Sequence, residues 1–332
     1  MFRGTTEHIA HQGNSFRSTD VLFLPPQKAG AKKMLVVISG THGIEGHIGS
    51  FLQLRMLNEI GRSAWRQIPA DVGLLFIHAL NPWGYTFGRR TDENNVDLNR
   101  NGTEAFVSRA DHKKYASILK PEIWNREVLD QLRTIVHDKV FRDATFGGQH
   151  DDPTGIFYGG ESESQCVAQL RNILKTYASD ADEIAVVDIH SGIGEYARGE
   201  IIAPFTSTKT PEARKLKKWL GLGIQYPNAG KESVSSPVSG DILSAITRWM
   251  PGKIYPIALE FGVLPIEVSL PSIVAENWVY HHPGVIEKQT EENIRRSFRA
   301  SFYPDHDDFW RGAVWSRFRD VVLAMLLGLA HS

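Results

Sequence analysis

Cysteine is nearly absent from this chain of 332 residues, in which Cys166 is the only one. Neither an intramolecular disulfide nor a zinc site built from cysteines alone can form, and a reducing compartment fits this usage. Long apolar runs are also missing, because the most apolar stretch, Val321 to Ala330, is far shorter than the ~20 residues of a membrane-spanning helix. The first residues, MFRGTTEHIAHQG, lack the apolar core of a secretory signal. We therefore expect a cytoplasmic, soluble protein that has no membrane partner.

The chain also lacks an excess of charge of either sign. Its 37 Lys and Arg residues against 38 Asp and Glu residues give a net charge of -1, so no overall basic field exists to attract nucleic acid. Hydrophobic residues make up 42%, which is ordinary for a globular protein with a large core and excludes a disordered chain. The length permits two domains. We expect a single domain over residues 1–332, with residues 266–332 packed on it as a C-terminal segment, because no clear linker separates them.

Short apolar runs alternate along the chain with helix-like periodic segments. This alternation is typical of an α/β fold with a mixed, mostly parallel sheet flanked by helices on both faces. Segments rich in Gly, Pro, Ser and Asp, at Phe141 to Gly160 and Tyr226 to Gly240, are expected to be long loops that frame a site. The predicted strands are Met34 to Ser39, Val72 to His78, Ile184 to Ile189, Ile201 to Pro204 and Ile254 to Glu260. The predicted helices are Ile48 to Ile60, Lys113 to Leu119, Arg126 to His137, Glu161 to Tyr177, Pro211 to Leu220 and Asp241 to Trp249, followed by an amphipathic C-terminal helix.

Two potential metal ligands, His42 and Glu45, lie in the motif GTHGIEG directly after the first of these strands. A His and a carboxylate three residues apart on a turn that opens into a helix project to one side and can bind one cation. Ligand sites of parallel α/β sheets gather at the carboxyl ends of strands, where this pair stands. Because the spacing is common by chance, a solvated turn is an equally good interpretation of this motif alone.

A third potential ligand, His190, lies in the motif VVDIHSG at the end of another apolar strand. On its own, this residue is better interpreted as a core histidine. Together with His42 and Glu45, it completes the ligand set of a catalytic zinc site that keeps one position open for water. Asp188, two residues earlier on the same strand face, could orient His190 through a hydrogen bond.

The motif IYPIALEFG brings a carboxylate, Glu260, to the end of an uncharged strand. Such a group is either paired structurally or held in a cavity, where burial raises its pKa towards that of a general base near neutral pH. Zinc lowers the pKa of a bound water to ~7, and a carboxylate beside it can accept the proton and return it to the leaving group.

Basic and amide side chains are concentrated in FGRRTDENNVDLNRN, which contains Arg89, Arg90, Asn99 and Arg100. An arginine binds a carboxylate in two-point fashion, and an Asn beside it can complete the clamp. A charged surface loop is the competing interpretation. The alternation of apolar and polar residues over positions 96–100 predicts a partly buried extended strand here.

In this order, the motifs resemble those of the zinc carboxypeptidase superfamily: GxHxxE, an Arg, the NR pair, a His after a strand and a late Glu. The stretches NVDLNRN, GTHGIEG, NPWG, FYGG and ENW resemble an uncharacterised bacterial branch that is similar to aspartoacylase and succinylglutamate desuccinylase. The resemblance covers roughly residues 34–265. It implies the zinc carboxypeptidase-like (phosphorylase/hydrolase-like) fold and a catalytic domain.

The resemblance also implies roles for individual residues. His42, Glu45 and His190 would hold one Zn²⁺ per chain, and Glu260 would act as general base and then acid. Asn99 and Arg100 would grip the terminal carboxylate of the substrate. The arginine that polarises the scissile carbonyl would be Arg90 by alignment with the desuccinylase branch, or Arg89 by alignment with carboxypeptidases. Ser191 matches a position that lines the carboxypeptidase site, whereas no tyrosine that covers the substrate can be assigned, and Tyr226 and Tyr280 are the candidates.

The sequence therefore predicts a zinc-dependent metallohydrolase that cleaves an amide bond next to a free carboxylate. Its substrate would be a small carboxylate-bearing amide or a peptide, cleaved as by a metallocarboxypeptidase or an N-acyl amino acid amidohydrolase. An esterase or deacylase for another acyl group, and a non-catalytic carboxylate-binding module, are the alternatives. A serine hydrolase is disfavoured, because no GxSxG motif occurs.

Overall fold

A mixed sheet of eight strands is the framework of the part of the chain that the computed structural model describes, which is residues 4–332 without 12–13, 63–67, 109–110, 231–234 and 251. The strand order is β1-β2-β4-β3-β5-β8-β6-β7. The strands are β1 (Thr5–His11), β2 (Asn14–Leu24), β3 (Lys33–Ser39), β4 (Val72–His78), β5 (Glu183–Tyr196), β6 (Gly199–Ile202), β7 (Ile224–Gln225) and β8 (Lys253–Gly262). The central strands β4, β3, β5 and β8 are parallel to one another, while β2 joins β4 and β6 joins β8 in antiparallel fashion.

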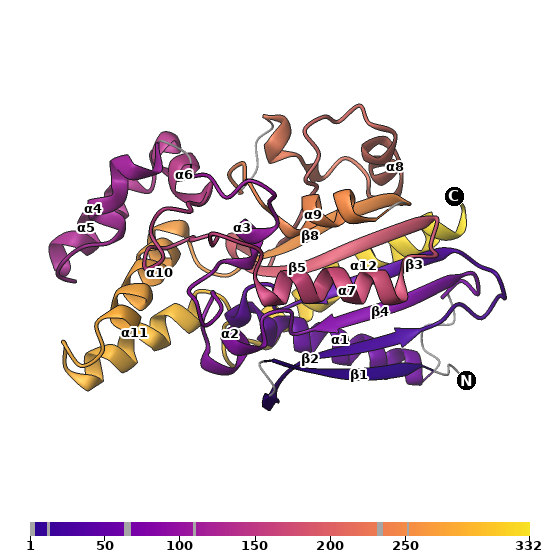
Figure 1. Ribbon diagram of the computed structural model, residues 1–332, viewed down its shortest axis with the longest axis horizontal. Coiled ribbons are helices and arrows are strands. Elements are labelled where there is room, and N and C mark those ends of the chain that lie inside the picture. Colours follow the sequence, from indigo (N-terminus) through magenta and orange to yellow (C-terminus); the bar gives the residue numbers. More distant parts are fainter. Residues whose placement is uncertain (1–3, 12–13, 63–67, 109–110, 231–234, 251) are drawn as a thin grey trace.

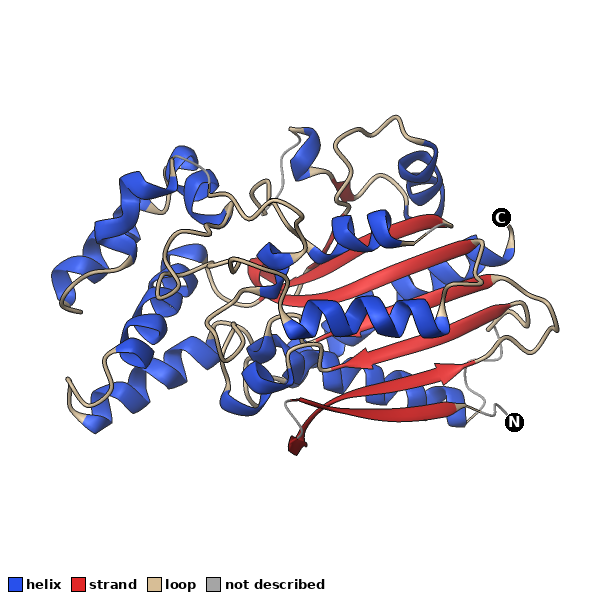
Figure 2. Ribbon diagram, viewed as in Figure 1, coloured by secondary structure: helices blue, strands red, loops and turns tan. Residues whose placement is uncertain are grey.

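The central strands are nearly continuous apolar runs because helices cover both faces of the sheet (Figure 2). Leu35 and Val37 of β3 face one core, and Val36 and Ile38 face the other. Helices α1 (Gly46–Gly61), α8 (Pro211–Leu220) and α12 (Asp308–Ala330) contribute to the first core. Helices α7 (Gln165–Tyr177) and α9 (Ile242–Trp249) contribute to the second. The predicted α/β fold with helices on both faces is thereby confirmed.

A third group of helices lies beyond the carboxyl ends of the central strands (Figure 1). Its core contains Leu132, Phe141, Val274 and Phe298, one each from α5, α6, α10 and α11. The helices of this region are α4 (Ala116–Leu119), α5 (Arg126–Ile135), α6 (Lys139–Phe146), α10 (Ile266–His281) and α11 (Lys288–Ala300), with the 3-10 helix η2 (His112–Tyr115). Shorter helices near the strand ends are η1 (Gly43–Glu45), α2 (Pro82–Phe87), α3 (Leu98–Asn101) and η3 (Pro227–Ala229).

Several predicted boundaries are wrong for identifiable reasons. The extended strand over positions 96–100 is the short helix α3, because the Asp97 side chain accepts a hydrogen bond from the Asn99 backbone N–H and caps that helix. The expected loop from Phe141 to Gly160 begins inside helix α6. The hairpin of β1 and β2 escaped prediction, because most of β1 is exposed and carries no apolar run. In the Tyr226 to Gly240 loop, positions 231–234 lie outside the described residues.

The C-terminal residues share the main core of the sheet. Trp310, Phe318 and Met325 of α12 are fully buried in the cluster that also holds β3 and α1 residues. We expect such packing if residues 266–332 belong to the same domain as the sheet. The assignment of one domain to residues 1–332 stays a prediction. Among the described helices, none combines the length and the apolar character needed to cross a membrane.

Candidate metal centre

The turn that carries His42 and Glu45 leaves the sheet at the end of β3. Gly40 has a φ of 67°, and a Cβ at this position would lie 2.6 Å from the Cβ of Ala79, so the turn requires glycine. The helix η1 then leads directly into α1. Both side chains are buried, and His42 Nδ1 lies 2.8 Å from Glu45 Oε1. The predicted turn therefore holds two possible ligands on one side.

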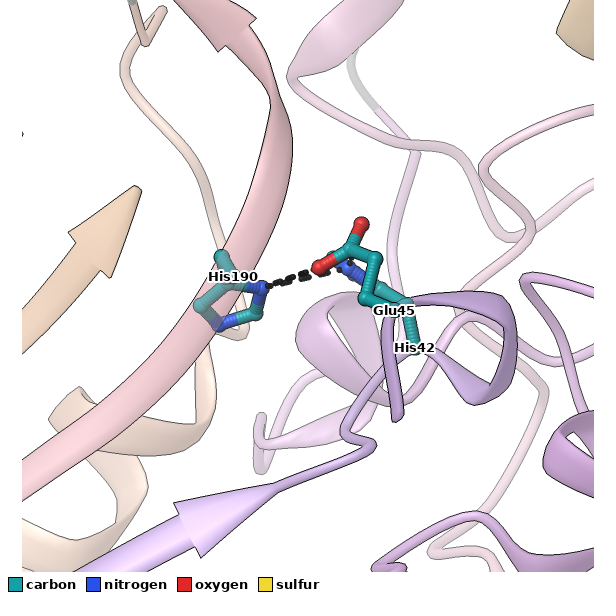
Figure 3. A group of neighbouring side chains, drawn as sticks. All are labelled: His42, Glu45 and His190. Carbon is teal, nitrogen blue, oxygen red and sulfur yellow. Dashed lines mark hydrogen bonds and ion pairs between the residues drawn. The ribbon is translucent and has the colours of Figure 1, made fainter. Parts of the chain in front are cut away.

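His190 reaches the same place from β5. This strand continues to Tyr196, so His190 lies within it rather than after it. Its Nδ1 is 2.9 Å from Glu45 Oε2 and 3.3 Å from His42 Nδ1. One ligand atom from each of the three residues lies within 4.8 Å of the others, and Figure 3 shows the three side chains converging.

Carboxylates face the remote nitrogens of both histidines. His190 Nε2 lies 2.7 Å from Asp188 Oδ2, and Asp188 Oδ1 accepts a hydrogen bond from Thr41 Oγ1 at 2.8 Å. His42 Nε2 lies 3.2 Å from Asp97 Oδ1 and 2.7 Å from Arg90 Nη2. When each Nε2–H donates to its carboxylate, both Nδ1 lone pairs face Glu45 and can bind a cation. Two imidazole nitrogens and a carboxylate are a donor set that suits zinc, so these residues fit the predicted ion.

The role of Asp97 is one that the sequence pattern did not reveal. Its two carboxylate oxygens contact different groups, because Oδ1 faces His42 and Oδ2 accepts a hydrogen bond from Arg90 Nε at 2.9 Å. Burial alone would raise the pKa of Asp97, but Arg90 and His42 hold it well below its usual range. Asp97 is therefore a buried anion that links a predicted ligand to a predicted catalytic arginine.

The electrostatic environment shifts the pKa values of the two glutamates of the site in opposite directions. Burial opposes ionisation of Glu45, yet the adjacent His42 and His190 lower its pKa well below its ordinary value. Burial and the negative charge of Glu45 raise the pKa of Glu260 to about 8. Glu260 stands beside His190 on the neighbouring strand β8, where these two residues are register partners. One glutamate is thus held as an anion, and the other is poised to take up a proton near neutral pH.

A cavity of about 130 Å³ opens onto these residues. Apolar side chains such as Ile202, Val238 and Leu243 form part of its wall. Of the metal-binding, substrate-binding and catalytic residues expected from the sequence, all but Arg89 line this cavity, namely His42, Glu45, Arg90, Asn99, Arg100, His190, Ser191 and Glu260, and Asp188 lines it too.

Neighbouring groups hold Asn99 and Arg100, the predicted carboxylate-binding residues, in place. Arg100 is buried, with Nε and Nη2 donating to the Phe146 carbonyl at 2.9 and 2.6 Å and Nη1 donating to the Asn99 carbonyl at 2.8 Å. Asn99 Oδ1 accepts from the Ile242 backbone N–H at 3.1 Å. Ser191 Oγ donates to the Phe302 carbonyl at 2.7 Å.

The two consecutive arginines point to different places. The Arg90 guanidinium lies against His42, Glu45 and Asp97, with Nη1 3.4 Å from Glu45 Oε1. Arg89 does not line the cavity and pairs with Glu276 of α10, from Nε to Oε1 at 2.9 Å and from Nη2 to Oε2 at 3.2 Å. The geometry favours Arg90 over Arg89 for any contact with a bound substrate.

Neither candidate for a covering tyrosine reaches the cavity. Tyr226 is buried, and its hydroxyl lies 3.4 Å from the Ala213 carbonyl. The Tyr280 ring packs against Arg89, 3.5 Å from the guanidinium carbon. No tyrosine is among the described residues that line the cavity.

Solved structures are similar to this chain at low sequence identity. Thrombin activatable fibrinolysis inhibitor is 12% identical, with 91% of this chain and 69% of that chain covered and a TM-score of 0.50. For carboxypeptidase A from Helicoverpa armigera the identity is 12%, the coverage 92% and 70%, and the TM-score 0.48. For the succinylglutamate desuccinylase from Chromobacterium violaceum these values are 14%, 91% and 71%, and 0.41. The likeness at a TM-score of 0.50 concerns the fold alone, and it confirms the zinc carboxypeptidase-like fold that the motifs imply.

The family to which the chain belongs is shown by its sequence. Residues 5–317 match the model of the family described as "Protein of unknown function (DUF2817)", so the chain is a member of that family. No curated protein matches the chain.

Proposed function

We propose that this protein is a metal-dependent hydrolase that cleaves an amide bond next to a free carboxylate. The observation that carries the proposal is the convergence of His42, Glu45 and His190, with Glu260 beside them on the same rim of the sheet. These three residues would hold one Zn²⁺ per chain. When bound, this ion would polarise the scissile carbonyl and lower the pKa of a water molecule.

The His42 hydrogen bonds set a condition for binding the ion. His42 Nε2 can accept from Arg90 Nη2 or donate to Asp97 Oδ1, but not both at once. Donation to Asp97 frees the Nδ1 lone pair for the cation, so Arg90 must turn Nη2 away from the ring. The freed guanidinium would then face the cavity, where it can stabilise negative charge on the carbonyl oxygen. Ion binding would thus prepare Arg90 for its role in the reaction.

Glu260 would take the proton of the attacking water and deliver it to the leaving nitrogen. Its pKa of about 8, raised by burial and by Glu45 when no ion is present, shows how strongly this environment disfavours a second anion. A cation held by His42, Glu45 and His190 would offset that repulsion and favour the ionised form of Glu260. Glu260 is therefore suited to exchange one proton during each cycle.

Asn99 and Arg100 would bind the free carboxylate of the substrate. The three bonds of Arg100 to the Phe146 and Asn99 carbonyls fix the guanidinium and leave further N–H groups to donate to an anion. Because this positive group is buried at the cavity, a carboxylate there would gain a charge-assisted bond. Ser191 would contribute to the wall of the cavity.

The test begins with the metal content of the purified protein. We expect about one zinc per chain and chelator-sensitive cleavage within a panel of short peptides, N-acyl amino acids and their carboxamide analogues. The carboxamides should be poor substrates, because they lack the charge that Arg100 would bind. A protein that binds the ion and carboxylates but cleaves no member of the panel would instead be a binding module. Cleavage of acyl esters that carry no carboxylate would support the esterase or deacylase alternative.

A further inference from the structure

Arg89 is held in a buried cluster that the proposed reaction does not use. Its side chain and that of Glu276 are 3% and 4% exposed, and they form two parallel N–H to oxygen contacts of 2.9 and 3.2 Å. Asn95 Oδ1 and Asn277 Oδ1 each lie 3.4 Å from Arg89 Nη2, and the Tyr280 ring covers the guanidinium. Such a two-point contact fixes the orientation as well as the distance of a side chain.

The backbone of Arg89 and Arg90 is bonded to the turn that carries the metal ligands. The Ile44 N–H donates to the Arg89 carbonyl at 2.8 Å, and the Gly43 N–H donates to the Arg90 carbonyl at 3.1 Å. These donors lie between His42 and Glu45 in the sequence. A displacement of the Arg89–Arg90 backbone would therefore move both ligands and the Arg90 guanidinium together.

The cluster also connects α10 to the loop that borders the cavity. Asn277 Nδ2 donates to the Thr154 carbonyl at 2.8 Å, and Asn95 Nδ2 donates to the Pro153 and Gly155 carbonyls at 3.0 and 2.9 Å. Phe157, a few residues further along this loop, lines the cavity. Glu276 thus lies where α10, the Arg89–Arg90 backbone and the loop that forms part of the cavity wall meet.

A buried ion pair of this kind is a weak source of stability, because the cost of removing both charges from water offsets their attraction. An apolar pair of similar size could fill the same space. The two parallel contacts, unlike an apolar contact, are directional and fix the orientation of α10 relative to the arginine side chain. The contacts therefore indicate a role in positioning rather than in stability alone.

We propose that Arg89 and Glu276 are a positioning pair, which fixes the Arg89–Arg90 backbone and through it the geometry of His42, Glu45 and Arg90. This inference rests on the proposed metal-dependent function. Arg89 and Glu276 touch neither the substrate nor the ion and act through the two hydrogen bonds to the ligand turn.

The test compares the zinc affinity of full-length variants by competition with a chromophoric chelator, well below the unfolding temperature. We expect Glu276→Gln and Arg89→Lys to weaken zinc binding by ~10–100-fold, the effect usual for residues that orient metal ligands. The matched control is Glu183→Gln, which disrupts the partly buried contact of Glu183 with Lys215 at the opposite end of β5. This control should lower the melting temperature without changing the zinc affinity.

A double variant separates positioning from stability. Arg89→Met combined with Glu276→Met replaces the ion pair by an apolar pair, which should restore the melting temperature towards that of the wild type. We expect zinc affinity to remain weakened in it, and the visible spectrum of its Co²⁺ form to differ from that of the wild type. Wild-type zinc affinity in Glu276→Gln, Arg89→Lys and the double variant would overturn the positioning role alone. A wild-type protein that binds no zinc would overturn the proposed function and this inference with it.

Discussion

Replacing Glu260 with Gln isolates the proton transfer from every other part of the proposed mechanism. Glutamine has nearly the same shape and can still accept the hydrogen bond from the Ile193 backbone, but it cannot take a proton. General-base catalysis contributes ~10²–10⁴-fold, so we expect kcat to fall by that factor, or about 3–5 kcal/mol in the barrier. KM should change little, because Asn99 and Arg100 would still bind the carboxylate.

Protein stability should not obscure this result. The positions of Glu45 and Glu260 disfavour two negative charges, and the substitution removes one of them. We therefore expect a metal-free variant at least as stable as the wild type at pH 8. The zinc content should remain unchanged, since the three proposed ligands are intact.

The assay measures kcat and KM with the best substrate of the panel, together with zinc content by mass spectrometry. Glu195→Gln is the matched control, because it makes the same chemical change at an exposed position, where Glu195 pairs with Arg198. It should have wild-type kinetics. Turnover of Glu260→Gln within a few-fold of the wild type, at full zinc content, would refute the role of this residue.

Three further predictions concern Asp97, the two arginines of the cavity and the buried His78. Asp97→Asn should weaken zinc binding ~10–100-fold in a chelator competition, and unchanged affinity would show that Asp97 does not orient His42. Arg90→Ala should mainly lower kcat, and Arg100→Lys should mainly raise KM. The reverse pattern in steady-state kinetics would mean that Arg90 binds the substrate carboxylate and that Arg100 stabilises the carbonyl oxygen. Burial lowers the pKa of His78 from 6.5 to about 4, so the unfolded chain binds this proton more tightly, and stability is lost as the pH falls from 6.5 towards 4. In urea unfolding, the protonation of His78 should lower the free energy of unfolding by about 2 kcal/mol at pH 5 relative to pH 7. His78→Gln should not show this part of the pH dependence.

The site was easiest to predict from the sequence where a His or Glu residue stands at the end of an apolar run that forms a strand. The apolar runs before His42 and up to His190 and Glu260 identify buried central strands, and parallel strands bring their carboxyl ends to one rim. For that reason the three proposed ligands could be grouped although His190 is far from His42 in the sequence. The spacing of His42 and Glu45 alone would not have sufficed.

Other features depend on contacts between distant segments. Arg89 and Arg90 are adjacent in the sequence, and contacts with distant residues such as Glu276 and Asp97 distinguish the arginine that faces the cavity from the one that does not. Helix α10 is buried on nearly all sides from Ser269 to Val279, so it carries no amphipathic pattern to reveal it. Asp97 lies in a polar segment whose alternation resembles a strand until its capping contact is known.

A zinc titration of the wild type and of His190→Ala, with His112→Ala as the control, tests the proposed metal centre most directly. His112 is a buried histidine outside the cavity, where its Nδ1 lies 3.3 Å from the Ala144 carbonyl. We predict tight binding of one zinc per chain in the wild type and in His112→Ala, and its loss in His190→Ala. Equal zinc binding by all three proteins, or no binding by the wild type, would contradict the assignment of His42, Glu45 and His190 as a metal centre.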